Sequence, residues 1–185
     1  MAKENPEEIV RNIIEYIGED AEREGLRETP KRVVAAWKKI FGGYKQKPED
    51  LLTIFEGEKY DEMIVVKNIE FYSTCEHHFL PFHGQIHIGY IPDGKIIGLS
   101  KLPRLVEIFS RRLQNQERLT SQIAKGLFSL LKPKGVGVVI EAKHLCMMAR
   151  GVEKQNSEVM TSSLLGLFKK DQNTRNEFLQ LIGRK

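Results

Sequence analysis

One short stretch, residues 73–83, constrains the fold of this 185-residue chain more than any other. It contains a thiol, a carboxylate and three imidazoles, a density of metal-capable groups found nowhere else in the sequence. Cys75 and His78 have the C-x-x-H spacing that lets two side chains of one tight turn reach a single ion, and a thiolate with a neutral imidazole suits zinc. The only plausible source of further ligands is the distant segment around His144 and Cys146, so the fold must bring the two segments together.

The segments that flank this stretch predict strands. Residues 64–72 and 85–91 are rich in β-branched and aromatic side chains, so residues 75–83 are expected to connect two strands. Residues 136–146 form the longest strand candidate, and a period of two places His144 and Cys146 on the same face. A turn at residues 92–95 leads into a short strand at 96–99, and a further extended piece is expected at 157–163.

Helical patterns occupy the rest of the chain. Asn5-Pro6 is typical of a helix start, its apolar stripe runs to Ile17, and Gly25 is the expected stop; a second helix follows at residues 29–41. Ser100 opens a helix whose apolar stripe extends to Leu113, and further helices are expected at about 117–131 and 174–182. This order predicts an α+β fold with helices layered on one face of a largely antiparallel sheet. We expect residues 1–55 to form an N-terminal helical arm and residues 56–185 the main domain.

Composition limits the class of protein. No apolar run approaches the roughly 20 residues that span a bilayer, and the first residues lack the apolar segment of a signal peptide, so we expect a cytoplasmic protein. The two cysteines can form one disulfide in principle. A thiol beside histidines in a chain without export signals favours a metal ligand or catalytic group instead.

The net charge of +4 suits an anionic partner. The densest basic cluster, Arg111-Arg112, is only a pair, so we expect no nucleic-acid binding and favour a compact phosphorylated metabolite. Lys101 and Arg104 lie in the first turn of the helix opened by Ser100, where free backbone amides also attract an anion. Arg150 follows Cys146 by four residues and is a further candidate, although any one of these cations taken singly is more often a solvated surface charge. Gly42-Gly43 follows a helix and therefore does not match a phosphate-binding loop.

Cys75, His78 and Cys146 make three zinc ligands, which is typical of a catalytic site with a position left for water. His77 or His144 as a fourth ligand would instead close a structural site, and spacing alone does not exclude it. The acid and base groups next to the ligands favour catalysis, because hydrolysis needs proton transfer as well as activated water. His83 and His87, on or near a strand, suit a hydrogen-bonded structural role. Glu117 is either a helix cap or a group that recognises adjacent N–H donors on a base.

Five ordered motifs closely resemble the GTP cyclohydrolase I family. They are residues 73–78 (STCEHH), 98–101 (GLSK), 114–120 (QNQERLT), 144–151 (HLCMMARG) and 172–178 (QNTRNEF), and residues 28–32 (ETPKR) resemble the N-terminal helical motif of the family. Together they cover about residues 29–182. One departure is Leu113, where some members carry proline, and it bears on helix packing more than on chemistry.

The resemblance implies the tunnelling fold, with sheets of several subunits closed into a barrel and two stacked pentamers forming a decamer whose sites lie between subunits. It implies conversion of GTP and water to 7,8-dihydroneopterin triphosphate and formate, the first step toward tetrahydrofolate-type pterins. Cys75, His78 and Cys146 would bind zinc, whose activated water attacks C8 of guanine. His144 would transfer a proton to the opening ring, His77 would act near the ribose oxygen, and Ser100 would assist the sugar rearrangement. Glu117 with Gln116 would bind the guanine edge. The triphosphate would be bound by Lys101, Arg104 and Arg150, with Arg32 as a weaker candidate.

Two alternatives stay open at this point. One is another purine or pterin enzyme of the same fold, such as a nitrile reductase with cysteine as covalent nucleophile. The other is a non-catalytic pterin- or nucleotide-binding module with structural zinc. The reductase alternative is disfavoured because both cysteines have histidines at ligand spacing. The non-catalytic alternative is disfavoured because the chain has a full set of acid, base and phosphate-binding groups.

Overall fold

The computed structural model describes residues 5–51, 54–56 and 60–184 of the chain. By packing, the chain divides into two compact units, Met1–Gly42 and Gly43–Lys185. The division into a helical arm of residues 1–55 and a catalytic domain of residues 56–185 stays a prediction. Residues 1–4, on which the expected lack of an export signal partly rests, lie outside the described residues.

The first unit contains two helices, α1 (Pro6–Tyr16) and α2 (Thr29–Ile40). The Asn5 side chain accepts a hydrogen bond from the backbone N–H of Glu7 at 3.1 Å, so the predicted start of α1 is confirmed. The predicted stop at Gly25 is wrong. α1 ends at Tyr16 because Gly18 adopts a left-handed backbone with φ of +93°, which ends a helix readily.

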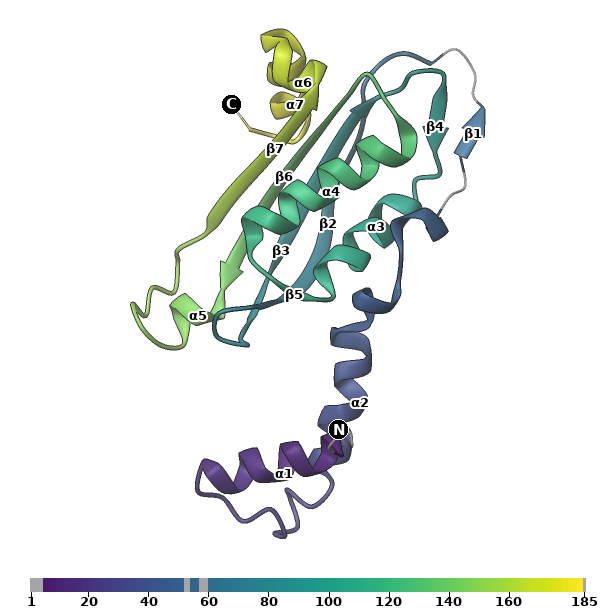
Figure 1. The fold of residues 1–185 in the computed structure, drawn as a ribbon. Coiled ribbons are helices and arrows are strands. Elements are labelled where there is room, and N and C mark those ends of the chain that lie inside the picture. Colours follow the sequence, from purple (N-terminus) through teal and green to yellow (C-terminus); the bar gives the residue numbers. More distant parts are fainter. Residues whose placement is uncertain (1–4, 52–53, 57–59, 185) are drawn as a thin grey trace. The chain divides into compact units, whose positions relative to one another are not determined.

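The second unit is built on a five-stranded sheet with the order β5-β2-β3-β6-β7 (Figure 1). Its long strands pair antiparallel, and only the short β5 pairs parallel, with the end of β2. The bounds are β2 (Ile64–Cys75), β3 (Pro81–Ile91), β5 (Leu113–Gln114), β6 (Gly135–His144) and β7 (Val159–Gly166). Two short strands, β1 (Ile54–Glu56) and β4 (Lys95–Ile97), form a separate antiparallel pair. The α+β class with a largely antiparallel sheet is therefore confirmed.

Two helices, α3 (Lys101–Ser110) and α4 (Gln116–Leu131), lie across one face of the sheet (Figure 1). Their apolar stripes and alternate residues of β3 and β6 form the main core. Several of its members are fully buried: Leu102, Leu105, Leu119, Ile123, Ile86, Ile88, Val138 and Ile140. This core fixes the position of the N-terminal end of α4, which carries two of the predicted substrate-binding residues.

The C-terminal helices α6 (Leu167–Lys170) and α7 (Gln172–Leu181) pack against the opposite face, at one end of the sheet. Phe168 and Phe178 lie over Gly89 and Gly137, where the missing side chains leave room for the two rings. A Cβ atom on Gly137 would lie 2.5 Å from the Phe168 ring. The remaining short helices are α5 (Leu145–Met148) and the 3₁₀ turns η1 (Gly42–Lys45) and η2 (Pro48–Leu51).

Three local predictions near the metal-capable stretch are corrected by the structure. β2 does not end at residue 72 but continues to Cys75, with the Ser73 hydroxyl donating to the Ser110 carbonyl at 2.7 Å. Leu113 is not part of a helix. α3 ends at Ser110, and Leu113 pairs with Thr74 in β5. β3 begins at Pro81 rather than near residue 85, so the connection between the strands shortens to residues 76–80.

Within the described ranges, no helix has the length and apolar character needed to cross a membrane.

Candidate metal centre and active site

The turn after β2 brings Cys75 and His78 together. The Cys75 backbone N–H donates to the Leu80 carbonyl at 2.8 Å, and the Cys75 carbonyl accepts from the Phe79 N–H at 2.9 Å. Phe79 adopts a positive φ of +58°, which closes the turn within five residues. As a result the Cys75 sulfur lies 3.9 Å from Nδ1 of His78. The C-x-x-H spacing therefore does place both side chains at one point.

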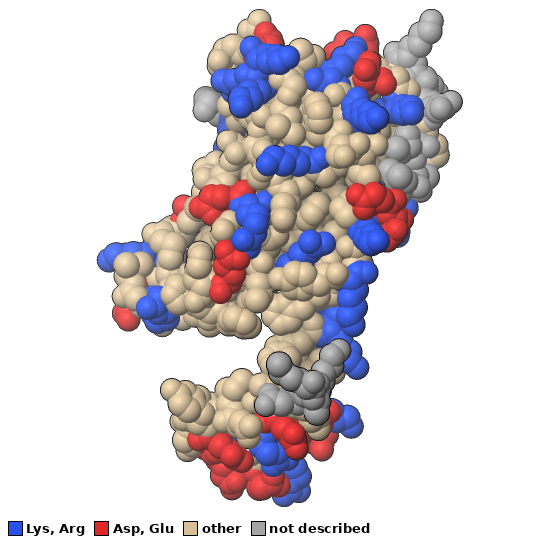
Figure 2. Space-filling view, viewed as in Figure 1, with Lys and Arg blue, Asp and Glu red and all other residues tan. Residues whose placement is uncertain are grey.

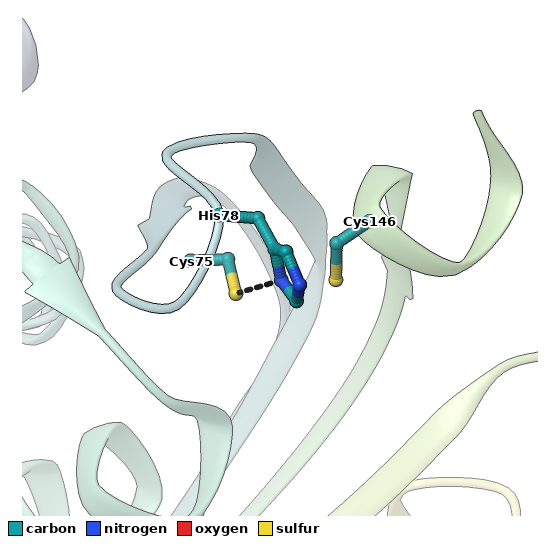
Figure 3. Close-up of side chains that lie close together, drawn as sticks. All are labelled: Cys75, His78 and Cys146. Atoms are coloured by element: carbon teal, nitrogen blue, oxygen red, sulfur yellow. Dashed lines mark hydrogen bonds between the residues drawn. The ribbon is translucent and has the colours of Figure 1, made fainter. Parts of the chain in front are cut away.

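Cys146 reaches the same point from the other side (Figure 3). The pairing of β3 with β6 puts Phe82 opposite His144, so β6 ends beside the start of β3. The prediction that Cys146 lies on the strand, on the same face as His144, is wrong, because β6 ends at His144 and Cys146 belongs to α5. This short helix carries the thiol to the turn, and the candidate ligand atoms of Cys75, His78 and Cys146 all lie within 4.8 Å of one another.

These three groups fit zinc in kind and in spacing. Ligand atoms of a tetrahedral zinc ion with one nitrogen and several sulfur ligands lie roughly 3.5 Å apart, close to the Cys75–His78 separation. Cys75 is buried, Cys146 half-buried and His78 exposed, so the site is open toward solvent on one side. Burial raises the pKa of the Cys146 thiol, and the adjacent Cys75 thiol raises it further. Two neighbouring thiols become thiolates together most readily when a cation lies between them.

His77 and His144 lie near the group but outside the three-ligand set. Nδ1 of His77 is 3.8 Å from the Cys75 sulfur, and its ring is largely exposed. His144 stacks on Phe82, with ring centroids 4.6 Å apart and planes inclined by 6°. Burial lowers the pKa of His144, while the negative charge of Glu117 acts in the opposite direction. Burial therefore favours the uncharged form of His144, and the Glu117 carboxylate at the start of α4 favours the charged form.

Gln116 and Glu117 begin α4 but differ in exposure. Glu117 is exposed in the first turn, and the helix cap is Asn115, whose side-chain oxygen accepts from the Arg118 N–H at 2.8 Å. The capping alternative for Glu117 is thus filled by another residue. Gln116 is only 1% exposed and is hydrogen-bonded to β6, β7 and His144.

A network that the sequence reasoning missed supports the metal-capable turn. Glu76 lies between the two ligands of the turn and pairs with the Arg118 guanidinium, and it also accepts from the Asn115 amide at 3.1 Å. The Arg118 hydrogen bond holds the pKa of the Glu76 carboxyl below its ordinary value. The Glu76 backbone N–H donates to Gln114 in β5 at 2.9 Å. Glu76 and Arg118 both belong to the family-like motifs, but nothing in their spacing indicates that they meet.

The predicted anion-binding residues divide into two places. Nη1 of Arg150 lies 3.3 Å from Nε2 of His78, next to the metal-capable group. Ser100, Lys101 and Arg104 lie at the start of α3, whereas the end of α3 leads to β5 (Figure 1). In β5, Gln114 pairs with Cys75. A ten-residue helix is about 15 Å long, so one chain does not bring these residues to its own metal-capable group. Arg32 lies on α2 in the first unit, and its role stays a prediction.

The other two histidines have structural contacts. Nδ1 of His87, which is 4% exposed, accepts a hydrogen bond from the Asn68 backbone N–H at 3.3 Å. His83 stacks on Tyr72 with centroids 5.3 Å apart.

On the face shown in Figure 2, Lys and Arg side chains are spread among acidic ones and form no single continuous basic stripe.

Comparisons with known proteins agree with these residues. The model of the GTP cyclohydrolase I family matches residues 6–183. A relative named GTP cyclohydrolase 1 from Wolinella succinogenes is 59% identical over 174 residues, covering 94% of this chain and 93% of that protein. Relatives of the same name from Methylococcus capsulatus (56% over 181 residues, 97% of each chain) and Helicobacter pylori strain G27 (57% over 178 residues, 95% of this chain and 98% of that protein) are similar.

Among solved structures, apo archaeosine synthase QueF-Like aligns with a TM-score of 0.46 and 17% identity over 56% of this chain and 93% of that one, a likeness too weak to carry an argument. The family match spans nearly the whole chain. The chain therefore belongs to the GTP cyclohydrolase I family.

Proposed function

We propose that this chain performs the GTP cyclohydrolase I reaction at the group formed by Cys75, His78 and Cys146, with zinc as the resident metal. As an enzyme of this family it uses GTP and water, opens the imidazole ring of guanine, releases formate and forms 7,8-dihydroneopterin triphosphate. The observation that supports the site best is the convergence of three ligand atoms from two distant segments within 4.8 Å. A cytoplasmic location stays a prediction from the sequence.

Two thiolates and one imidazole match the ligand preference of zinc, and a three-ligand set leaves a position for water. When bound, zinc would lower the pKa of a coordinated water toward neutrality and so supply hydroxide for attack on C8 of the base. Arg150, whose guanidinium lies 3.3 Å from the His78 ring, places a positive charge at the edge of this group. That charge suits an anionic substrate.

His144 and His77 carry the proton transfers in this proposal. His144 is half-buried, and burial lowers its pKa and so favours the form that can take a proton and return it to the ring nitrogen as the C–N bond opens. Stacking on Phe82 fixes the plane of the His144 ring and leaves its edge to exchange the proton. His77 is exposed at 3.8 Å from Cys75, where it can act on the ribose side of the substrate.

Glu117 binds the guanine edge. A carboxylate only accepts hydrogen bonds, which matches the adjacent N–H donors at N1 and N2 of guanine. Glu117 is exposed in the first turn of α4, beside His144, and so can approach a base held near that imidazole. The resemblance also implies that Gln116 binds the guanine edge, but the NH₂ group of the Gln116 side chain is bonded to β6 and β7.

A neighbouring copy of the chain completes the triphosphate site. Ser100, Lys101 and Arg104 lie at the far end of α3 from this chain's own Cys75, so they would serve the site of the next subunit. The outer edge of β7, the last strand of the sheet in the described residues, and most of β2 at the other edge are available for strand pairing between copies. We therefore keep the decamer of two stacked pentamers as the proposed assembly.

Activity is tested with purified, zinc-loaded protein incubated with GTP. Formate and the fluorescent oxidised pterin are measured with and without a chelator. We expect both products from the loaded protein, their loss with the chelator, and their return when zinc is added back. A His83→Gln variant serves as a matched control, because His83 stacks on Tyr72 and is not part of the ligand group. Absence of both products from the zinc-loaded protein would contradict the proposal.

A further inference from the structure

Gln116 joins the neighbouring strands β6 and β7 to the imidazole of His144. Its Nε2 donates to the carbonyl oxygens of Ile140 at 3.2 Å and Val159 at 2.9 Å, and it lies 3.1 Å from the Thr161 hydroxyl. Its Oε1 lies 2.7 Å from Nε2 of His144. The side chain is 1% exposed, so water does not substitute for these partners.

The identity of the partners fixes the orientation of the amide. Carbonyl oxygens only accept hydrogen bonds, so the atom of Gln116 that faces Ile140 and Val159 must be the NH₂ group. The opposite orientation would place three carbonyl oxygens together in a buried pocket and leave them without a donor, which is costly. The Gln116 oxygen therefore faces His144, and because it can only accept, Nε2 of His144 must carry a hydrogen.

We propose that Gln116 is a positioning residue that keeps the hydrogen of His144 on Nε2, so that Nδ1 is the ring atom available to the substrate. Within the described part of the chain, Nδ1 of His144 has no hydrogen-bond partner, whereas Nε2 is occupied by Gln116. Stacking on Phe82 prevents the ring from turning out of its plane. The proposal rests on the proposed role of His144 and assigns Gln116 to the protein side of the site rather than to the guanine edge.

The tautomer is measured without any reaction. The probe is ¹⁵N-histidine-labelled, zinc-loaded full-length protein at alkaline pH without GTP, and His144 is assigned by the signals that disappear in His144→Gln. We expect a pyrrole-type Nε2 and a pyridine-type Nδ1 in the native protein. In Gln116→Met we expect a mixture of tautomers or the Nδ1–H form. A native protein with hydrogen on Nδ1 of neutral His144 would overturn the proposal.

Kinetics separate positioning from substrate binding. Gln116→Met should lower kcat on the order of 10²- to 10⁴-fold, with KM for GTP changed by less than about threefold, because a misplaced proton affects the reaction and not ground-state binding. A raised KM with unchanged kcat would assign Gln116 to guanine recognition and overturn the proposal. The native protein is measured in the same formate assay. If the proposed function is wrong, the native protein itself releases no formate; if only the role of Gln116 is wrong, the native protein is active and the variant behaves differently from the expectation.

Two further variants guard against a merely structural effect. Gln116→Glu keeps an acceptor oxygen for His144 while it loses the donors to β6 and β7, so it should keep the Nε2–H tautomer and more of kcat than Gln116→Met. Thr161→Val removes one hydrogen-bond partner of the Gln116 NH₂ group and leaves the hydrogen bonds of that group to the carbonyl oxygens of Ile140 and Val159. The kcat of this variant should therefore stay within about threefold of native. Equal losses of kcat in Gln116→Met and Gln116→Glu, with the Nε2–H tautomer present in both, would overturn the proposal.

Discussion

At the residue scale, the histidines of the second unit differ in what surrounds each ring. His78 is exposed at the metal-capable group, His144 is half-buried against Phe82, and His87 is almost fully buried with a backbone donor on its Nδ1. Sequence reasoning separated His87 from the others because it falls inside a strand pattern. The sequence does not indicate which residues contact His144, because Phe82 and Gln116 lie far from His144 in the chain. The role of each histidine therefore depends on tertiary contacts, which the spacing of residues along the sequence does not predict.

Cys146→Ala tests whether the metal serves catalysis rather than folding. The variant should lose zinc and turnover at least 10²-fold but remain folded, because the core of the second unit lies between α3, α4 and the sheet. Zinc content by elemental analysis, far-UV circular dichroism and formate release measure these three properties. Global unfolding of the variant would instead indicate a structural metal.

His87 makes stability depend on pH. Burial lowers its pKa from the ordinary value of 6.5; the Glu141 carboxylate raises it, and the charges of Arg184 and Lys67 lower it. Since the folded pKa lies below the unfolded one, the unfolded chain binds more protons between the two values. The free energy of unfolding should therefore fall as pH drops through about 6.5, by at most about 1.4 kcal/mol per pH unit for this group.

Urea unfolding over a pH series measures this slope. His87→Gln, whose side chain can still accept from the Asn68 N–H, should flatten it. An unchanged slope in the variant would show that another group is responsible.

At the element scale, short connections decide the geometry of the site more than the long strands do. The sequence correctly predicted that the segment around Cys146 meets the turn after Cys75, but it predicted one continuous strand. The four-residue helix α5 does not show in a period-two pattern, because Val136 to Ile140 dominate that pattern. Likewise Leu113 continues the apolar spacing of α3 yet belongs to β5, where it pairs with Thr74 next to Cys75. Local patterns locate elements well and their ends poorly.

The ion pair of Glu76 with Arg118 ties the metal-capable turn to α4, and Arg118→Gln tests its contribution. Loss of the pair should free the turn between Cys75 and His78 and weaken zinc affinity by about 10- to 100-fold. Competition with a chromophoric chelator measures the dissociation constant, and excess zinc should restore most of kcat. Glu107→Gln, which breaks an exposed pair on α3, is the matched control and should leave zinc affinity unchanged. Native affinity in Arg118→Gln would rule out a supporting role for the network.

At the scale of the whole molecule, the candidate site is divided between two ends of the second unit. The ligand group and Arg150 lie where β2 ends, and Lys101 and Arg104 lie at the start of α3. The family resemblance explains this division through sites formed between subunits. Light scattering should accordingly give a mass several times that of the 21.3 kDa chain.

Complementation between two inactive variants tests the shared site. Lys101→Ala and Cys146→Ala should each be inactive alone, because one lacks a phosphate-binding cation and the other a metal ligand. When the two are co-expressed, about one quarter of sites should combine an intact Lys101 from one chain with an intact Cys146 from its neighbour. Formate release from the mixed oligomer measures the recovery. If both residues act within one chain, the mixture should be as inactive as its components.

The sequence by itself determined the α+β class, the helices at the start and middle of the chain, and the set of metal-capable residues. Each of these follows from local causes: side-chain periodicity, capping residues, and the affinity of thiolates and imidazoles for zinc. The tertiary structure alone decided that Cys146 approaches from a short helix, that Glu76 meets Arg118, and that Gln116 faces His144. These contacts join residues distant in the chain, and they depend on where β2, β6 and α4 end within the packed core, which no local pattern records.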